Sequence, residues 1–322
     1  MKQSWLVSLL TWVCLSAQGA PAYFGLIGDM PYSAWEEQRL PLLMAEMDAQ
    51  PLAFVIHDGD IKNGSGVCSD EIYQAMLDTF QASAHPLVYV PGDNEWTDCH
   101  LRLNARFDPQ ERLERLRALF WVGDTSLGRR KMALERQSAQ ASFAAYRENV
   151  RWEFAGVLFV GLNLPGSENN FYGVSIASPD RTGPVAEFVE RGAANRAWLS
   201  EAFALARRKN LPGLVIVAHG NPGFEAWNAG RAKAGYVDFL TQLRTEVQAF
   251  SGQVVLVHGD THNHQIDKPL RDGKSGDVIG NFTRVETFGF PHFGWVRGSV
   301  DTDDPRIFRF VPQPWGRSDR AP

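Results

Sequence analysis

The sequence has 322 residues, of which 44% are hydrophobic and 21% are charged, with 37 acidic against 32 basic side chains. This composition is typical of a globular protein and excludes a disordered or collagen-like chain. The formal net charge of −5 offers no field that would attract a polyanion, so we expect no nucleic-acid partner. The length allows either one domain or two.

The first 22 residues have the features of a secretory signal peptide. Lys2 precedes a short apolar run over residues 5–17, and the small residues Gly19, Ala20 and Ala22 offer cleavage sites. The run is too short to cross about 30 Å of hydrocarbon, so we expect no stable membrane insertion after cleavage. An uncleaved anchor is the alternative. We therefore predict a secreted or periplasmic protein in which residues 23–322 form a single domain.

Five apolar runs rich in β-branched residues each end at a glycine beside Asp, Asn or His. Such runs are typical of buried strands that end in polar turns. They cover residues 22–29, 51–60, 86–95, 213–219 and 253–262. Helix-like segments alternate with them, at residues 33–49, 69–82, 196–209 and 236–250. The alternation predicts an α/β fold with parallel strands, whose carboxyl ends and following turns open on one edge of a sheet.

The second half of the chain also holds a strand-rich stretch with hairpin signals and few helices. It covers residues 151–163, 281–288, 293–300 and 306–310. A second sheet packed on the first is the simplest arrangement for these strands. The sequence contains no internal repeat and no second long apolar segment.

The turns after the five main runs carry oxygen and imidazole donors. Several carboxylates brought together repel one another and stay partly protonated unless a cation compensates them. Carboxylates and imidazoles without thiolates suit Mn, Fe or Zn, and these donors outnumber the ligands of one tetrahedral ion. We therefore predict two divalent or trivalent metal ions. The candidate ligands are Asp29, Asp60, Asp93 or Asn94, His219, Asp260 and His262.

The ordered series of these motifs resembles the calcineurin-like metallophosphoesterases, from about Tyr23 to Asp267. A single Gly-Asp turn also fits a helix cap, so the resemblance rests on the whole series. In chain order the motifs are Gly-Asp29, Gly-Asp60, Gly-Asp-Asn-Glu95, His219 and Gly-Asp-Thr-His262. The resemblance implies an α/β fold of two mixed β-sheets packed face to face and flanked by helices, with a two-metal site at the strand ends.

Carried over residue by residue, the resemblance also implies roles for these ligands. Asp29 holds the first metal, Asp60 bridges both metals, and His219 holds the second metal. Asp260 and His262 stand in the positions of the two histidines of the family's Gly-His-x-His motif. Because Asp260 is charged where the family has a neutral histidine, the site is more negative than the family's usual set.

Other departures from the family bear on the chemistry. Asp29-Met30-Pro31 replaces Asp-x-His, which removes one ligand of the first metal, as also happens in the branch that includes the purple acid phosphatases. That branch has a tyrosine three residues after the bridging Asp, where this chain has Asn63, so we expect no iron–tyrosinate chromophore. Asp93 stands where the family has its Asn ligand, although the adjacent Asn94 is an alternative ligand. Asn94 also replaces the histidine near the leaving group, and it donates hydrogen bonds but cannot transfer a proton.

These features predict an exported metallophosphoesterase that hydrolyses a small-molecule phosphate ester. We expect in-line attack on phosphorus by a hydroxide that bridges the two ions. The added negative charge disfavours a doubly charged monoester and favours a phosphodiester. Besides Asn94, the candidate catalytic residue is a proton donor, either His57, His100 or His264. His57 is preferred because the neighbouring Asp58 would raise its pKa.

The alternative function is a catalytically degenerate metal-binding protein, in which the replaced ligands have ended turnover and the cleft serves recognition. Other hydrolase classes lack support, since the sequence has no Gly-x-Ser-x-Gly elbow, Walker loop or His-Glu-x-x-His motif. The sequence leaves the oligomeric state and the native metals open.

Two further features concern the surroundings of the site. Cys68 lies shortly after Asp60 and Cys99 shortly after Asp93, so turns on one sheet edge would bring the two sulfurs together. We predict a disulfide, which suits an exported chain; thiolate ligands are the alternative. The arginine-rich segment 102–136 is typical of a solvated helix face, and an arginine offered to a phosphate is the alternative.

Overall fold

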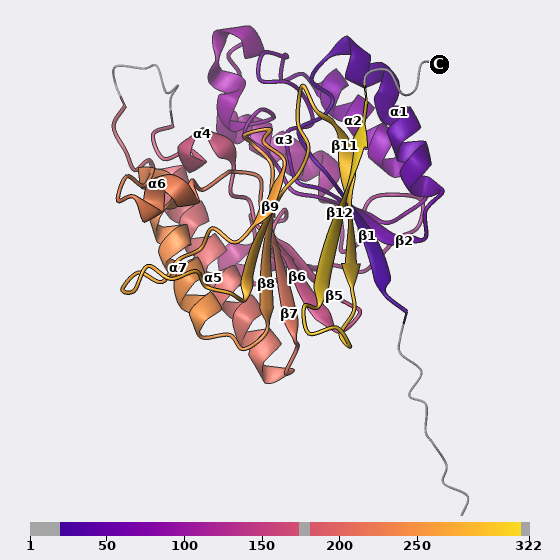
Figure 1. The fold of residues 1–322 in the computed structure, drawn as a ribbon. Helices are drawn as coiled ribbons and strands as arrows, with labels where there is room; N and C mark the ends of the chain where they lie inside the picture. The colour runs from indigo at the N-terminus through magenta and orange to yellow at the C-terminus, as the bar shows by residue number, and fades with distance from the viewer. Residues whose placement is uncertain (1–19, 174–180, 317–322) are drawn as a thin grey trace, which may run out of the picture.

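The computed structural model describes residues 20–173 and 181–316. Within these ranges the strands form one sheet of five strands and one of seven, with helices on both outer sides (Figure 1). The predicted signal peptide lies outside the described residues except at residues 20–22. None of the described helices is both long enough and apolar enough to cross a membrane.

The five-stranded sheet has the strand order β12-β11-β1-β2-β3. Its parallel strands are β1 (Ala22–Ile27), β2 (Leu52–His57) and β3 (Leu87–Tyr89). Two antiparallel strands complete it, β11 (Phe293–Val300) and β12 (Phe308–Trp315). Because β11 pairs with β1 from Ala22↔Val300 to Leu26↔Val296, the first and last parts of the described chain lie side by side.

The seven-stranded sheet has the strand order β4-β5-β6-β7-β8-β10-β9. Its parallel strands are β6 (Val157–Gly161), β7 (Gly213–Val217), β8 (Gln253–His258) and β10 (Phe282–Glu286). Its antiparallel strands are β4 (Glu135–Arg136), β5 (Val150–Phe154) and β9 (Gln265–Asp267). β6 and β7 are buried along their whole length, as expected for parallel strands that are covered on both faces.

The division of strands between the sheets differs from the prediction. The sequence pattern places all five runs that end in polar turns in one sheet and the later strand-rich stretch in another. In the structure β1, β2 and β3 belong to one sheet, whereas β7 and β8 belong to the other. The alternation of strands and helices shows which strands are parallel, but it does not show that the antiparallel β5–β6 hairpin joins the same sheet as β7 and β8. Two mixed sheets flanked by helices nevertheless confirm the predicted fold class.

Three of the predicted helices lie where the sequence places them. They are α1 (Ala34–Asp48), α2 (Asp70–Ala82) and α7 (Val237–Gln248). The fourth, α5 (Ala186–Arg208), begins before the predicted residue 196, because its first turns bury the polar Arg191 and so hide the apolar period. The remaining helices are α3 (Pro109–Phe120), α4 (Gly166–Asn169) and α6 (Phe224–Asn228), with 3₁₀ turns at Thr97–His100, Arg102–Asn104, Gln137–Ala139, Ala141–Phe143 and Ala234–Tyr236.

An apolar layer between the sheets joins them into one body. Phe24 on β1 meets Phe159 on β6 edge to face, with ring centroids 5.2 Å apart. On the outer faces α1 and α2 cover the five-stranded sheet, and α5 and α7 cover the seven-stranded sheet (Figure 1). Each large apolar side chain buried in this way stabilises the fold by about 1.5–3 kcal/mol.

Cys68 and Cys99 form the predicted disulfide, with their Cα atoms 5.7 Å apart. The bond links the turn after β2 to the turn after β3. Closing a loop with a sequence separation of 31 restricts the unfolded chain and stabilises the fold by roughly 3–4 kcal/mol. Both sulfurs are therefore unavailable as metal ligands.

Candidate metal centre

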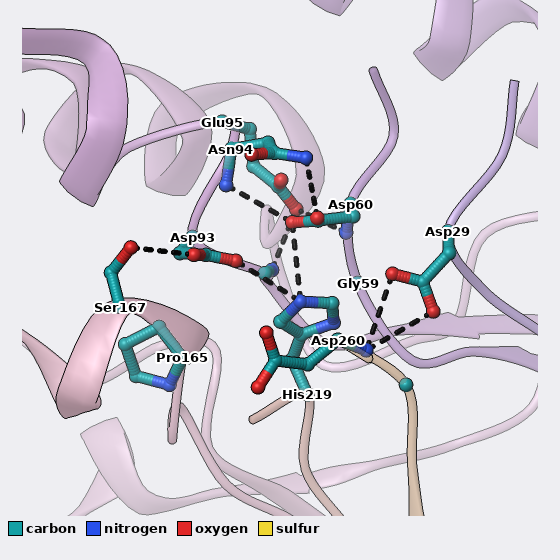
Figure 2. Close-up of polar contacts among 12 residues, drawn as sticks. Asp29, Gly59, Asp60, Asp93, Asn94, Glu95, Pro165, Ser167, His219 and Asp260 are labelled. Atoms are coloured by element: carbon teal, nitrogen blue, oxygen red, sulfur yellow. Dashed lines mark hydrogen bonds and ion pairs between the residues drawn. The ribbon is translucent and has the colours of Figure 1, made fainter. Parts of the chain in front are cut away.

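The turns that follow β1, β2, β3, β7 and β8 bring Asp29, Asp60, Asp93, His219 and Asp260 together (Figure 2). Asp29, Asp60 and Asp260 each follow a glycine and have positive φ angles of 49°, 59° and 76°. This left-handed conformation is strained for a residue with a side chain, and such strain concentrates at functional sites. The backbone N–H of Asp260 donates to both carboxylate oxygens of Asp29 at 3.2 Å, which joins a turn of one sheet to a turn of the other.

A first group of donors comprises Asp29, Asp60 and His219, whose ligand atoms all lie within 4.8 Å of one another. All three side chains are buried. Nε2 of His219 lies 3.3 Å from Oδ1 of Asp60. Nε2 of His262 lies 3.4 Å from Oδ1 of Asp29, so a second imidazole borders this group.

A second group comprises Asp93, His219 and Asp260, again with ligand atoms within 4.8 Å of one another. Nε2 of His219 lies 3.1 Å from Oδ1 of Asp93. On the other side of the ring, Nδ1 lies 3.0 Å from the carbonyl oxygen of Asp58. A proton on Nδ1 suits that carbonyl and leaves the Nε2 lone pair directed at the carboxylates, an arrangement common for metal-binding histidines.

Neighbouring glycines leave the space that the carboxylates occupy. A Cβ added to Gly92 would collide with the Asp60 carboxylate, and a Cβ added to Gly259 would collide with that of Asp29. Gly92 and Gly259 therefore make room for the acidic residue of a different turn, and Gly59 makes room for the imidazole of His219. This cross-packing explains why the motifs occur as a series.

Burial of these carboxylates around one imidazole shifts their protonation. Burial, together with the charge of Asp93, raises the pKa of Asp260 to about 7. Burial also raises the pKa of Asp60. Burial disfavours the charged form of His219, but the neighbouring Asp60 and Asp93 outweigh it and raise the pKa. Cations would relieve this repulsion, so the donor set of carboxylates and imidazoles fits two metal ions.

Asn94 occupies a different place from Asp93. Its side-chain N–H group donates to Oδ2 of Asp60 at 2.5 Å and to the backbone carbonyl of Lys62 at 3.1 Å. Asp93 instead lies within the second group of donors. Of the two adjacent candidates, the geometry favours Asp93 as the ligand and Asn94 as a hydrogen-bond partner of Asp60.

Comparison with known proteins links this geometry to a fold. No protein-family model and no curated protein matches the sequence. A dimetal phosphatase from Danio rerio matches in structure over 92% of this chain and 97% of its own, with a TM-score of 0.55 at 16% identity. A purple acid phosphatase from yellow lupin, Lupinus luteus, matches over 92% of this chain and 54% of its own, with a TM-score of 0.50 at 12% identity. The chain has the calcineurin-like metallophosphoesterase fold.

The metallophosphoesterase fold confirms the resemblance drawn from the motifs, including the pair of mixed sheets. At these identities the likeness extends to the fold alone, and the chain spans about half the length of the lupin protein. The candidate metal centre lies where the strand-end turns of the metallophosphoesterase fold converge (Figure 2).

His57, preferred as the proton donor, belongs to neither donor group. Its ring is fully buried, with Phe80 5.0 Å away between ring centroids, and Nε2 lies 3.4 Å from the carbonyl of Met30. Burial lowers its pKa to about 3, so the expectation of a raised pKa is wrong. The reason is the alternation of side chains along a strand: Asp58 points to the other side and accepts a hydrogen bond from Thr287.

The other two histidines nominated as proton donors are also held outside the donor groups. Nδ1 of His100 lies 2.6 Å from the carbonyl of Thr97. His264 stacks on Phe288 at 4.2 Å between ring centroids, and its Nδ1 lies 2.7 Å from the carbonyl of Glu286. These contacts tie both rings to the backbone near them.

The arginine-rich segment differs from a fully solvated helix face. Arg112 and Arg117 on α3 are buried, and their guanidinium groups pair with Asp70 at 2.9 Å and Glu148 at 2.6 Å. These ion pairs attach α3 to neighbouring elements. Neither arginine is offered to a phosphate at the metal centre.

Two functional candidates were missed by the motif pattern. The hydroxyl of Tyr32 donates a hydrogen bond to Oδ2 of Asp60 and accepts one from Asn94 at 2.7 Å. Ser167 reaches the centre from a separate segment, with Oγ 2.8 Å from Oδ2 of Asp93 (Figure 2). Tyr32 shares the turn of Asp29, which is a usable signal, whereas nothing in the sequence around Ser167 indicates its role.

Ser167 belongs to a left-handed turn, defined here as Ser167–Asn170, in which all four residues have φ between 46° and 57°. The buried guanidinium of Arg191 stabilises it, donating to Oδ1 of Asn169 at 2.5 Å and to the carbonyl of Asn169 at 2.9 Å. A Cβ added to Gly166, just before the turn, would lie 2.7 Å from carboxylate atoms of Asp93 and Asp260. The left-handed turn therefore forms a close wall of the second donor group.

Proposed function

We propose that the protein is a metal-dependent phosphoric ester hydrolase with a dinuclear centre. The observation that supports this most strongly is the pair of donor groups that share His219 at the strand ends of a metallophosphoesterase fold. Asp29, Asp60 and His262 would hold one ion. Asp93, His219 and Asp260 would hold the other, with Asp60 between the two. When bound, the ions supply Lewis acidity for the phosphoryl oxygens and the hydroxide that attacks phosphorus.

Residues behind the ligands orient them. The carboxylate of Glu95 accepts hydrogen bonds from the backbone N–H groups of Asp60 and Gly92, which fixes the turn that carries Asp60. The backbone N–H of Asn221 donates to Oδ2 of Asp260 at 2.8 Å. Such outer partners hold ligand atoms in place, and their removal typically lowers metal affinity about 10–100-fold.

The substrate is proposed to be a small-molecule phosphate ester, with a phosphodiester preferred over a monoester. The support is electrostatic, since Asp29, Asp60, Asp93 and Asp260 all lie in the two donor groups. Two divalent cations would only balance four carboxylates, which leaves little attraction for a doubly charged monoester. A singly charged diester is disfavoured less.

Export to the periplasm or the exterior is also part of the proposal. The disulfide is typical of oxidising compartments. Ala22 already pairs with Val300 in β1, so cleavage after Gly19 or Ala20 would leave this strand intact. Residues 23–322 are proposed to act as a single domain.

A second candidate function is metal-dependent recognition without turnover. It is favoured by one observation: His57, His100 and His264 all make contacts outside the donor groups. Asn94 stands at the position of the family's histidine and cannot transfer a proton. A poor leaving group would then depart without general-acid assistance.

Hydrolysis of bis-p-nitrophenyl phosphate and p-nitrophenyl phosphate by protein reconstituted with Mn, Fe or Zn separates the two functions. We expect turnover of the diester, its loss together with the ions in Asp60→Ala, and retention of both in the control Asp303→Ala, which changes an exposed carboxylate. Bound ions without turnover of either ester would favour recognition. Undiminished activity in Asp60→Ala would remove the proposed mechanism.

A further inference from the structure

The two sheets do not end together at the side where β12 and β9 form their edges (Figure 1). The ring of Phe308 on β12 packs over the start of β7, where a Cβ added to Gly213 would lie 2.6 Å from it. In the seven-stranded sheet, β8, β10 and β9 continue past β7. The larger sheet therefore extends beyond the smaller one here and leaves part of its inner face uncovered.

A cavity of about 420 Å³ occupies this seam between the sheet edges. Sites for small molecules measure about 300–1,000 Å³, so its size suits a ligand of that kind. Phe308 and Phe310 on β12 and Val255 on β8 bring the apolar layer between the sheets to the cavity. Ile266 on β9 lines it as well and is 39% exposed. An apolar ligand would remove this surface from water, which is favourable.

The lining of the cavity is positively charged, although the protein carries a formal net charge of −5. Lys268, Arg306 and Arg309 line the cavity, and no acidic residue is among its lining residues. Asp304 pairs with Arg306 at 2.6 Å and offsets one of these charges. The remaining charge favours an anionic group on the ligand.

Lys268 places an ammonium group beside the apolar walls without a carboxylate partner. The group donates to the backbone carbonyl of Gly280, to that of Phe282 at 3.3 Å and to Oγ1 of Thr283 at 3.5 Å. All three acceptors are neutral, and Lys268 forms no ion pair within the described part of the chain. Burial lowers the pKa of this ammonium, an effect that a bound anion would offset.

The edge of β12 argues against a peptide strand as the occupant of the seam. Pro312 and Pro314 stand opposite Val296 and Gly294 of β11, and prolines in an edge strand turn their missing N–H outward. An added strand would find no donor at these two positions, and such prolines protect sheet edges from pairing. A small molecule held by apolar walls and one charge needs no backbone ladder.

We propose that this seam is a binding site for a free anionic amphiphile with a single aliphatic chain, of the class of long-chain carboxylates. The chain would lie between Phe308 and Ile266, and the carboxylate would meet Lys268. The site is separate from the metal centre, because β8 begins at Gln253, which lines the cavity, and ends at His258, just before the Gly-Asp turn. The inference therefore does not depend on the proposed hydrolase.

The test is calorimetric titration of the full mature chain with decanoate below the concentration at which it forms micelles. A chelator removes metal ions, so that the carboxylate cannot bind to them. We expect saturable binding of one molecule per chain. Lys268→Met removes the charge but keeps a side chain of similar length, and it should weaken decanoate binding about 10-fold while leaving the affinity for uncharged decanol unchanged. The matched control Lys274→Met changes an exposed lysine outside the cavity and should alter neither affinity.

A second variant tests the apolar wall. Ile266→Asp brings a polar group of like charge to the ligand and should weaken decanoate binding by at least about 10-fold. Val278→Asp, which also changes an exposed branched residue but lies outside the cavity, should have no effect.

Absence of saturable decanoate binding by the wild-type chain would overturn the proposal, whatever the result of the ester hydrolysis assays. Unchanged decanoate affinity in Lys268→Met or in Ile266→Asp would overturn it as well. Co-sedimentation of the chain with vesicles of anionic phospholipid, without binding of free decanoate, would also overturn it, because the surface charge and not the cavity would then hold the lipid. The ratio of decanoate to decanol affinity is measured within one protein, so a change in overall stability does not decide the result.

Discussion

The two sides of the metal centre are held in place by different means. On one side, the turns of Asp29, Asp60 and Asp260 follow buried strands, with Asp29 packed against Gly259 and Asp60 packed against Gly92. On the other side, the left-handed turn Ser167–Asn170 lies beyond the end of β6 and depends on a guanidinium from α5. The first side is built from local motifs, and the second is built from long-range contacts.

The difference separates ligand supply from ligand placement. The strand-end turns provide the donor atoms, whereas the left-handed turn contributes one hydroxyl and a close wall beside Asp93. Damage to the strand-end turns should therefore abolish metal binding. Damage to the left-handed turn should leave the ions bound and change how the site holds them or its substrate.

The largest effect should come from the metal itself. Because Asp60 and Asp260 are buried beside other carboxylates, bound cations remove a repulsion that the metal-free protein carries. With free metal at about 1,000 times its dissociation constant, we expect about 4 kcal/mol of added stability in urea unfolding. Asp93→Ala should reduce this gain, and Asp303→Ala should not. Identical unfolding curves with metal and with chelator would contradict the strand-end side of the comparison.

A somewhat smaller effect is expected when the left-handed turn loses its anchor. Arg191 is only 1% exposed and donates to Glu187 at 2.6 Å as well as to Asn169. Arg191→Met leaves these partners buried and unpaired, which should cost about 3 kcal/mol in urea unfolding. The matched control on the same helix is Arg196→Met, an exposed arginine that should change stability by less than about 0.5 kcal/mol.

Metal stoichiometry gives the sharper test of Arg191→Met. If the left-handed turn only places ligands, the variant should still bind two ions by elemental analysis, with weaker diester hydrolysis. Loss of both ions in the folded variant would show that this turn supplies ligands as well.

The strand-end turns could be predicted because each signal is local. A buried run followed by Gly-Asp specifies a strand, a turn and a donor within a few residues, and Asp29 and Asp60 illustrate this directly. The fold class follows from the same runs. Which sheet each strand joins could not be predicted, because pairing such as that of β1 with β11 is set by contacts between opposite ends of the chain.

The pKa of His57 was predicted wrongly and the role of Ser167 was missed because sequence spacing does not determine the direction in which a side chain points. His57 is adjacent to Asp58 in the sequence, yet the two side chains leave the strand on opposite sides, so the supposed charge effect is absent. Ser167 is distant from every motif, and it reaches Asp93 only because a strained backbone is stabilised by Arg191. Motif spacing contains no information about either geometry.

An intermediate effect on stability should follow from filling the space between two strand-end turns. The Cβ of Gly92→Ala would meet the carboxylate and backbone nitrogen of Asp60, so the turn must shift. We expect about 2 kcal/mol of destabilisation in urea unfolding, as for other overpacked sites, and loss of high-affinity metal binding by calorimetry. The control Gly280→Ala adds a Cβ where no atom lies within 4 Å. Unchanged metal affinity in Gly92→Ala would show that these turns adapt more freely than their packing suggests.

The smallest effect tests the point where the two sides meet. Oγ of Ser167 lies 2.8 Å from Oδ2 of Asp93 and 2.8 Å from Oδ1 of Asp98. Burial and the charge of Asp93 raise the pKa of Asp98 to about 7, so a protonated Asp98 can donate to Ser167 while Ser167 donates to Asp93. Ser167→Ala should cost about 1 kcal/mol of stability and roughly 10-fold in affinity for one of the two ions.

Calorimetric titration resolves the two binding events in Ser167→Ala. Because the hydroxyl contacts Asp93 and not Asp29, only the ion held by Asp93, His219 and Asp260 should bind more weakly. If both ions bind more weakly by the same factor, the two donor groups, which share His219, behave as one unit. The difference between the two sides would then not extend to their metal-binding free energies.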